Sequence, residues 1–214
     1  MCYALAMIKK YILFDFDGVI ANSFEPAFET KKLICPLMTE EQYRGLFEGN
    51  INDWLTSDNS HTDQCRHDIE WFSVYLPRMK KGIDIFPGMK DVIVDLEKDY
   101  TLVIVSSTLT FPIEEFLTSH DLRNHFDWVM GNDVHKSKVE KIKMVFEKYN
   151  TTAKDCVFVT DTLGDIREAE KTGVAAIAVS WGFNKHDTLL RGNPFRLVDT
   201  QKELLGGIND YFNQ

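Results

Sequence analysis

Two acidic residues stand two positions apart at the end of an apolar run, in the stretch ILFDFDGVI at residues 12–20. Asp15 and Asp17 carry like charges. At about 4 Å and an effective dielectric of about 20, their repulsion amounts to roughly 4 kcal/mol. A purely structural role would not select such a pair. We therefore expect a cation to lie between the two carboxylates, or one of them to hold a proton.

A second acidic pair, Asp161 and Asp165, follows another apolar run in the stretch TDTLGDI. Both pairs stand where a predicted strand ends, and the carboxyl ends of parallel strands meet at one edge of a sheet. Converging carboxylates offer the hard oxygen ligands that Mg²⁺ prefers, with waters and a substrate phosphate completing the octahedron. The sequence therefore predicts a magnesium site formed by Asp15, Asp17, Asp161 and Asp165.

Hydroxyl and cationic side chains occur at two further places. A third apolar run ends in Ser106 and Ser107, where a hydroxyl and backbone N–H groups can hold phosphoryl oxygens. Lys136 and Lys138 stand just before a helical pattern over residues 139–149. A lysine there would offer positive charge where the negative charge of a phosphate gathers.

The elements that must position these residues alternate between strands and helices. Helical spacing of apolar residues is clearest over residues 139–149, and Pro112 suits the first turn of another helix. Continuously apolar runs, typical of strands buried on both faces, cover residues 11–16, 102–105, 128–130, 157–160 and 175–179. The alternation predicts an α/β fold with a parallel sheet and ligands at the carboxyl ends of its strands.

The alternation stops between residues 22 and 84, where helical patterns occur without a convincing strand. Thr39 to Gln42 resembles a capped helix start, and apolar residues cover much of the segment 68–79. We predict a small α-helical cap at 22–84, inserted after the first strand of a core formed by 8–21 and 85–214. We interpret four aromatic residues as packing inside this cap: Trp54, Trp71, Phe72 and Tyr75.

The composition limits the kinds of partner. The chain has 214 residues, 44% of them hydrophobic, which suits one domain with a modest insertion. Its 24 basic and 33 acidic residues give a net charge of −9, and no Lys/Arg-rich run occurs. This balance argues against nucleic acid or an anionic membrane as a partner and leaves a small anion in one locally positive pocket. Monomer and homodimer both stay open.

The four cysteines are scattered along the chain and form no close pair. We therefore predict neither a zinc site nor a disulfide framework, and expect a reducing, cytoplasmic setting. No apolar stretch approaches the roughly 20 residues that a membrane-spanning helix needs.

These residues, taken in order, resemble the haloacid dehalogenase (HAD) superfamily, most of whose members are magnesium-dependent phosphohydrolases. Its first motif reads FDFDGVI here, its second reads LVIVSS, its third is a lysine ahead of a helix, and its fourth reads VFVTDTLGD. The stretch FPGM at residues 86–89 is most similar to the branch that contains phosphoglycolate phosphatase and β-phosphoglucomutase. The resemblance spans residues 11–200 and implies a Rossmann-like core with a mobile helical cap.

The resemblance also implies a reaction. Asp15 would be the nucleophile that becomes an aspartyl-phosphate, and Asp17 the acid that protonates the leaving oxygen and then activates water. Ser106 and one lysine would hold the transferring phosphoryl group. The phosphoglycolate phosphatase pattern selects Lys136, whereas the spacing in phosphoserine phosphatases selects Lys138. We favour Lys138, which is closer to the helix start.

Further ligands follow from the same resemblance. The metal would be Mg²⁺, held by Asp15, the backbone carbonyl of Asp17, Asp161 and, directly or through water, Asp165. Substrate contacts are expected from Ser106, Ser107, Gly18 and Asn22.

The predicted function is hydrolysis of a small phosphorylated metabolite of the phosphoglycolate, sugar phosphate or nucleotide class. A phosphomutase of the β-phosphoglucomutase type uses the same core and is the main alternative. A dehalogenase would not need Asp17, and a non-catalytic receiver-like phospho-switch would carry no helical insertion.

Overall fold

The computed structural model describes residues 9–52, 65–66 and 68–213, so Trp54 lies outside the described residues. Its centre is a six-stranded parallel sheet with the order β3-β2-β1-β4-β5-β6. The strands are β1 (Tyr11–Phe14), β2 (Thr101–Val105), β3 (Phe126–Met130), β4 (Cys156–Thr160), β5 (Ala175–Val179) and β6 (Arg196–Val198). The predicted α/β fold is confirmed. The sequence reading missed β6, which is only three residues long and begins with an arginine.

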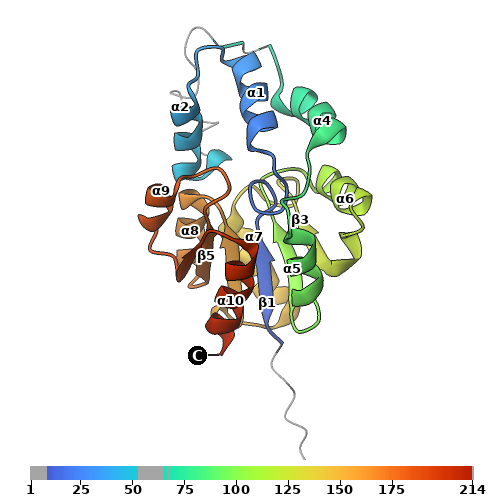
Figure 1. Cartoon of the computed structure of the whole chain (residues 1–214), viewed down its shortest axis with the longest axis vertical. Helices are drawn as coiled ribbons and strands as arrows, with labels where there is room; N and C mark the ends of the chain where they lie inside the picture. The colour runs from blue at the N-terminus through green and yellow to red at the C-terminus, as the bar shows by residue number, and fades with distance from the viewer. Residues whose placement is uncertain (1–8, 53–64, 67, 214) are drawn as a thin grey trace, which may run out of the picture.

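Helices cover both faces of the sheet (Figure 1). The core helices are α5 (Met89–Leu96), α6 (Thr110–Ser119), α7 (Lys138–Tyr149), α8 (Leu163–Glu170), α9 (His186–Leu190) and α10 (Gln201–Phe212), with 3-10 turns η2 (Arg123–His125) and η3 (Ala153–Asp155). Alternate residues of β1 point to opposite faces of the sheet. Ile12 and Phe14 pack with α5, α6 and α10, whereas Tyr11 and Leu13 pack with α7 and α8. All four residues are buried, which explains the unbroken apolar run.

The strand register brings the predicted motifs to one edge of the sheet. Phe14, the last residue of β1, pairs with Ile104 of β2 on one side and Val159 of β4 on the other. The three central strands therefore end at nearly the same level. The residues that follow them, Asp15 after β1 among them, meet above that edge.

Among the described residues, three further helices lie together above the carboxyl ends of the strands (Figure 1): α1 (Phe24–Ile34), α2 (Glu40–Gly45) and α4 (Trp71–Gly82), with the 3-10 turn η1 (Leu46–Glu48) beside α2. We call these elements, together with the described residues that connect them, the cap. The chain leaves and re-enters the core at adjacent points, because the Asn22 N–H donates to Asp84 O (2.8 Å) and the Phe86 N–H to Ile20 O (3.0 Å). Two such neighbouring crossings let the cap sit over the end of β1 as one unit.

Local sequence signals explain where the cap helices begin. At the start of α2, Thr39 Oγ1 accepts from the Gln42 N–H (3.2 Å), and the Gln42 side chain accepts from the Thr39 N–H (2.9 Å). This reciprocal pair is the predicted capping box. At the start of α4, the Glu70 side chain caps the Ser73 N–H (2.7 Å).

One expectation from the cysteines was wrong. Cys35, at the end of α1, and Cys65, ahead of α4, form a disulfide. They are 30 positions apart in the chain, and only the folding of the cap brings their Cα atoms within 4.3 Å. Sequence spacing alone carries no signal of such a pair. Cys156 is buried in the core and free, as expected.

Among the described residues, no helix has both the length and the apolar character that crossing a membrane would require.

Candidate active site

A lysine lies between two carboxylates at the floor of the site. Asp15 follows β1, Lys138 is the first residue of α7, and Asp165 lies in the first turn of α8. Lys138 Nζ is 2.8 Å from Asp15 Oδ2 and 2.6 Å from Asp165 Oδ2. All three side chains are buried. Thr160 Oγ1 also donates to Asp165 Oδ2 (2.7 Å), and the Phe16 N–H donates to Asp15 Oδ1 (2.8 Å).

The charged groups of this cluster shift one another's pKa values. Burial works against the charged form of Lys138, but Asp15 and Asp165 outweigh it and raise its pKa. Burial also opposes the ionised form of Asp165, yet Lys138 and hydrogen bonds hold the pKa of that carboxyl below its ordinary value. For Asp15 burial prevails over Lys138, and its pKa is raised well above the ordinary value. One lysine therefore does not fully compensate the negative charge of the site.

Asp161 is completely buried beside this cluster. Its Oδ2 accepts from the Phe183 N–H (2.6 Å), whereas its Oδ1 has no hydrogen-bond partner among the described residues. Burial raises the pKa of Asp161 to about 7. A buried carboxylate oxygen without a donor is rare in folded proteins and is a natural position for a cation.

Gly18 allows the chain to pass close to Asp161. Its φ is +75°, and a Cβ on this residue would lie 2.0 Å from Asp161 Oδ2. Gly182 is equally tight, with 2.2 Å to the same oxygen. Backbone packed this closely around a carboxylate requires glycine, so the glycine of the first motif acts here by making room for Asp161.

Asp17 is held by two hydroxyl groups that the sequence reading did not assign to the site. Tyr75 OH donates to Asp17 Oδ1 (2.8 Å), and Thr108 Oγ1 donates to Asp17 Oδ2 (2.6 Å). Tyr75 belongs to α4 of the cap, and Thr108 follows β2. Burial raises the pKa of Tyr75 well above its ordinary value, so its hydroxyl keeps the proton that it donates. No local signal marks Tyr75, which was interpreted as packing inside the cap.

Hydrogen bonds to Ser106 hold the loop that follows β2. Ser106 is buried, and its hydroxyl accepts from the Thr108 N–H (3.0 Å). Its carbonyl accepts from Lys141 Nζ, which also lies 3.3 Å from Gly131 O. Burial, reinforced by Lys138, lowers the pKa of Lys141 to about 8. Lys141 was also missed, although its spacing of three from Lys138 puts both lysines on one face of α7.

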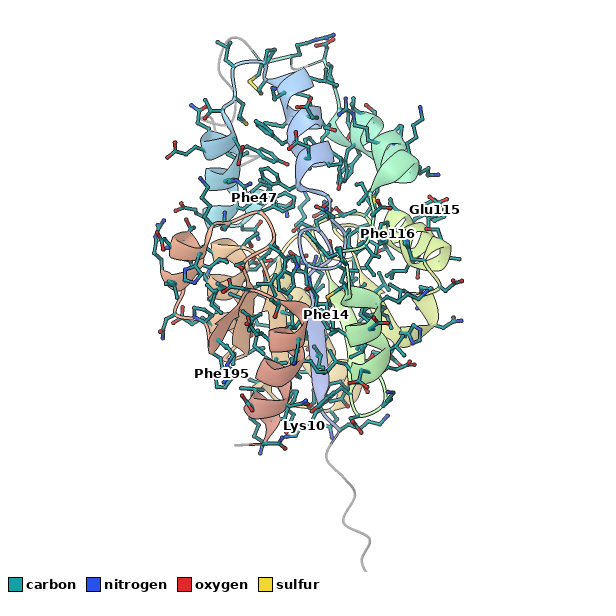
Figure 2. The ribbon with its side chains drawn as sticks, in the orientation of Figure 1. Lys10, Phe14, Phe47, Glu115, Phe116 and Phe195 are labelled. Carbon is teal, nitrogen blue, oxygen red and sulfur yellow. A yellow bond between two sulfur atoms is a disulfide. The ribbon has the colours of Figure 1, made fainter. Side chains whose placement is uncertain are left out.

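These groups open into a cavity of about 370 Å³ between the cap and the core. From the predicted site, Asp15, Asp17, Ser106, Ser107, Lys138 and Asp165 line it. The cap contributes mostly apolar and aromatic side chains, together with Lys31 and Glu70: Ala27, Ile34, Tyr43, Leu46, Phe47, Ile51, Ile69, Trp71, Phe72 and Tyr75. Phe47 lies where the cap meets the core (Figure 2), with its ring 4.8 Å from that of Phe183.

Four predicted site residues do not line this cavity: Gly18, Asn22, Lys136 and Asp161. Gly18 and Asp161 pack against each other beside the cluster described above. Lys136 lies in the loop before α7 with its side chain exposed, and its carbonyl accepts from the Asn52 side chain (3.0 Å). Asn22 is also exposed and does not line the cavity. Lys138 is the first residue of α7, and its ammonium group, not that of Lys136, contacts Asp15.

A sequence model of the family described as haloacid dehalogenase-like hydrolase matches residues 12–179, which hold all four motifs. The chain belongs to this family. Membership explains why an acidic pair after β1 and another after β4 occur in one chain.

Curated relatives match along nearly the whole chain. A phosphoglycolate phosphatase from Synechococcus elongatus is 24% identical over 209 residues, covering 95% of this chain and 99% of the relative. A probable phosphatase, IndB, from Dickeya dadantii is 30% identical over 215 residues, covering 93% of each. Among solved structures, CbbY from Rhodobacter sphaeroides in complex with phosphate has a TM-score of 0.74 at 20% identity, over 94% of this chain and 100% of that one. The last likeness shows a shared fold.

Proposed function

We propose that this HAD-family hydrolase is a magnesium-dependent phosphatase that cleaves small phosphate monoesters through an aspartyl-phosphate intermediate. The observation that carries the proposal is the position of Lys138 between Asp15 and Asp165 at the floor of the cavity. A buried ammonium beside a carboxylate nucleophile can neutralise the charge of a phosphoryl group that arrives between them. The phosphatase names of the two curated relatives support the same reaction.

The proposed reaction has two steps. Asp15 attacks phosphorus, an aspartate–phosphorus bond forms, and the bond from phosphorus to the ester oxygen breaks while Asp17 gives that oxygen a proton. Asp17 then takes a proton from a water, which attacks phosphorus, and the bond to Asp15 breaks. Inorganic phosphate and an alcohol are the products. Ser106 and Ser107, on the loop after β2, would bind the phosphoryl oxygens.

The donor set fits Mg²⁺. The ligands would be Asp15, the backbone carbonyl of Asp17, and Asp161, whose unpartnered Oδ1 is a ready oxygen donor. The described residues hold no ready-made cluster of three acidic, histidine or cysteine ligands. Mg²⁺ suits such a site, because it commonly takes one or two carboxylates and fills its octahedron with waters and substrate phosphate. When bound, it would neutralise phosphoryl charge and orient the ester for in-line attack.

The cap supports the proposal by enclosing the reaction. Its apolar side chains form the upper wall of the cavity, and Tyr75 reaches down to Asp17. Such a wall keeps bulk water away from the aspartyl-phosphate during the first step.

The test is release of inorganic phosphate from p-nitrophenyl phosphate by the purified chain with MgCl₂. We expect turnover that EDTA abolishes and that Asp15→Asn lowers by at least about 10³-fold. Asp187→Asn removes a fully exposed carboxylate and is the matched control, expected to retain activity. Full activity of Asp15→Asn, or no turnover of this ester or of a broad panel of phosphorylated metabolites, would contradict the proposal.

A further inference from the structure

The cap side of the cavity carries aromatic rings that the protein itself covers only in part. Phe47, Trp71 and Phe72 line the cavity and are neither exposed nor buried, whereas Tyr43 and Tyr75 are buried. From the sequence we predict that Trp71 and Phe72 pack inside the cap. Their half-covered rings, turned toward the cavity, instead offer apolar surface to whatever enters it.

The two ends of the cavity differ in chemistry. The core end holds the carboxylates, serines and Lys138, which suit a phosphate. The cap end is largely apolar, with Lys31 and Glu70 as its charged side chains. The volume of the whole cavity, about 370 Å³, falls in the range of roughly 300–1,000 Å³ that is typical of small-molecule sites. A phosphate on a two-carbon acid would leave much of this space unfilled.

We infer that the substrate is a phosphate monoester whose leaving group carries an aromatic ring, bound against Trp71, Phe72 and Phe47. The inference rests on the proposed phosphatase function and adds the substrate class. Trp71 is itself stacked on Tyr75, with ring centroids 5.3 Å apart and planes 26° apart, so the wall is preorganised. A flat ring can form offset or edge-on contacts with these three side chains, which an aliphatic group cannot.

The test compares benzyl phosphate with ethyl phosphate, two alkyl esters whose leaving oxygens have similar basicity. We expect kcat/KM to be at least about tenfold higher for benzyl phosphate, from burial of the ring. Trp71→Leu and Phe72→Leu keep an apolar side chain but remove the ring, and each should lower this ratio toward one. Phe195→Leu is the control, since this partly exposed phenylalanine lies in the core far from the cap (Figure 2) and should leave the ratio unchanged.

Equal kcat/KM for the two esters, or a preference that survives both cap variants, would overturn the substrate class and leave the phosphatase intact. Hydrolysis of neither alkyl ester and of no p-nitrophenyl phosphate would instead contradict the proposed function. The two failures are therefore distinguishable.

A second inference comes from the contacts of Asp17. One of its oxygens accepts from Tyr75 of the cap (2.8 Å) and the other from Thr108 of the core (2.6 Å). Tyr75 belongs to α4 of the cap and Asp17 follows β1 of the core, so this contact requires the cap to lie over the site. A hydroxyl donates to an ionised carboxylate and accepts from a protonated one. Tyr75 can therefore hold Asp17 in both of the protonation states that the two reaction steps require.

We propose that Tyr75 is a positioning residue that links cap closure to proton transfer by orienting Asp17. An acid can protonate a leaving oxygen only from hydrogen-bond distance and in the correct direction. An open cap would remove one of the two donors that fix Asp17. Proton transfer would then be efficient only after substrate has been enclosed.

The test is Tyr75→Phe with two esters of different leaving-group basicity. kcat/KM reports the steps up to formation of the aspartyl-phosphate, in which Asp17 protonates a benzyloxy group, whereas p-nitrophenolate leaves without a proton. We expect kcat/KM to fall by at least about tenfold for benzyl phosphate and by less than about threefold for p-nitrophenyl phosphate. Thr108→Val removes the other donor to Asp17 and should show the same difference between the two esters. This variant provides the test if Tyr75→Phe folds poorly.

Tyr43→Phe is the matched control. Tyr43 is another buried tyrosine of the cap that lines the same cavity, but among the described residues its hydroxyl is not a donor to Asp17. Its loss should leave the ratio of the two kcat/KM values unchanged. Equal losses for both esters in Tyr75→Phe, or no loss for either, would overturn the positioning role.

Discussion

Lys138 Nζ lies 2.8 Å from Asp15 Oδ2, and both side chains are buried, although the two residues belong to separate halves of the chain. The same ammonium reaches Asp165, so a single cation joins the end of β1 to the start of α8. This contact favours Lys138 over Lys136 as the lysine of the proposed reaction. Lys138 therefore holds the site together through its two ion pairs, in addition to its role in the proposed reaction.

Lys138→Met should lower kcat for p-nitrophenyl phosphate by at least about 100-fold, because the phosphoryl charge loses its neutralising partner. Lys136→Met is the matched control, since this lysine is exposed two positions earlier, and its kcat should stay within about twofold of the parent. Steady-state phosphate release checks both variants. A comparable loss in Lys136→Met would contradict the assignment of Lys138.

Mg²⁺ should stabilise the folded chain, because ligands that bind only the native state add RT ln(1 + [L]/Kd) to its stability. At a hundredfold excess over Kd this amounts to about 2.7 kcal/mol. Asp161→Asn removes the charge of the carboxylate with the unpartnered oxygen and should abolish most of the rise in Tm. Thermal melting across a MgCl₂ titration is the measurement. An undiminished rise in Asp161→Asn would show that the ion binds elsewhere.

Lys141 should make stability rise with pH. Its pKa is about 8 in the folded chain and about 10.4 when unfolded, so between these values the unfolded chain binds more protons. Stability attributable to Lys141 is therefore lowest below pH 8 and increases toward pH 10, by up to about 3 kcal/mol. The measurement is the free energy of unfolding in urea from pH 7 to 10. It should rise more with pH for the parent than for Lys141→Met.

Lys143→Met is the control for this pH dependence. Lys143 lies on the same helix with an exposed side chain paired to Glu140, and its variant should follow the parent at every pH. Parallel curves for the parent and Lys141→Met would mean that Lys141 has the same proton affinity in the folded and unfolded chains.

Reduction of the Cys35–Cys65 disulfide should lower the free energy of unfolding of the chain. Opening a cross-link that spans 30 residues restores chain entropy to the unfolded state, worth about 3.6 kcal/mol. Urea denaturation with and without tris(2-carboxyethyl)phosphine measures the difference in the free energy of unfolding. The double variant Cys35→Ser/Cys65→Ser should have the same free energy of unfolding as the reduced parent, with or without the reductant. A parent that is equally stable with the reductant would contradict this expectation.

Much of the core and its chemistry could be predicted because the signals are local. A strand buried on both faces needs a continuous apolar run, and polar residues that end such a run must lie at an edge of the sheet. Asp15, Asp161 and Ser106 were therefore recognisable one strand at a time. The capping box at Thr39 is equally local, since both partners lie within one turn of helix.

Only the tertiary structure decided which distant side chains meet. The hydrogen bond from Tyr75 to Asp17 and the Cys35–Cys65 disulfide join segments that meet only through the packing of the cap. The ion pair between Lys138 and Asp15 joins segments that the parallel sheet brings together. Spacing along the chain records periodicity and strand ends, and long-range contacts leave no trace in it. The sequence by itself thus determined the parallel core and its acidic residues, whereas the packing of the cap decided what surrounds them.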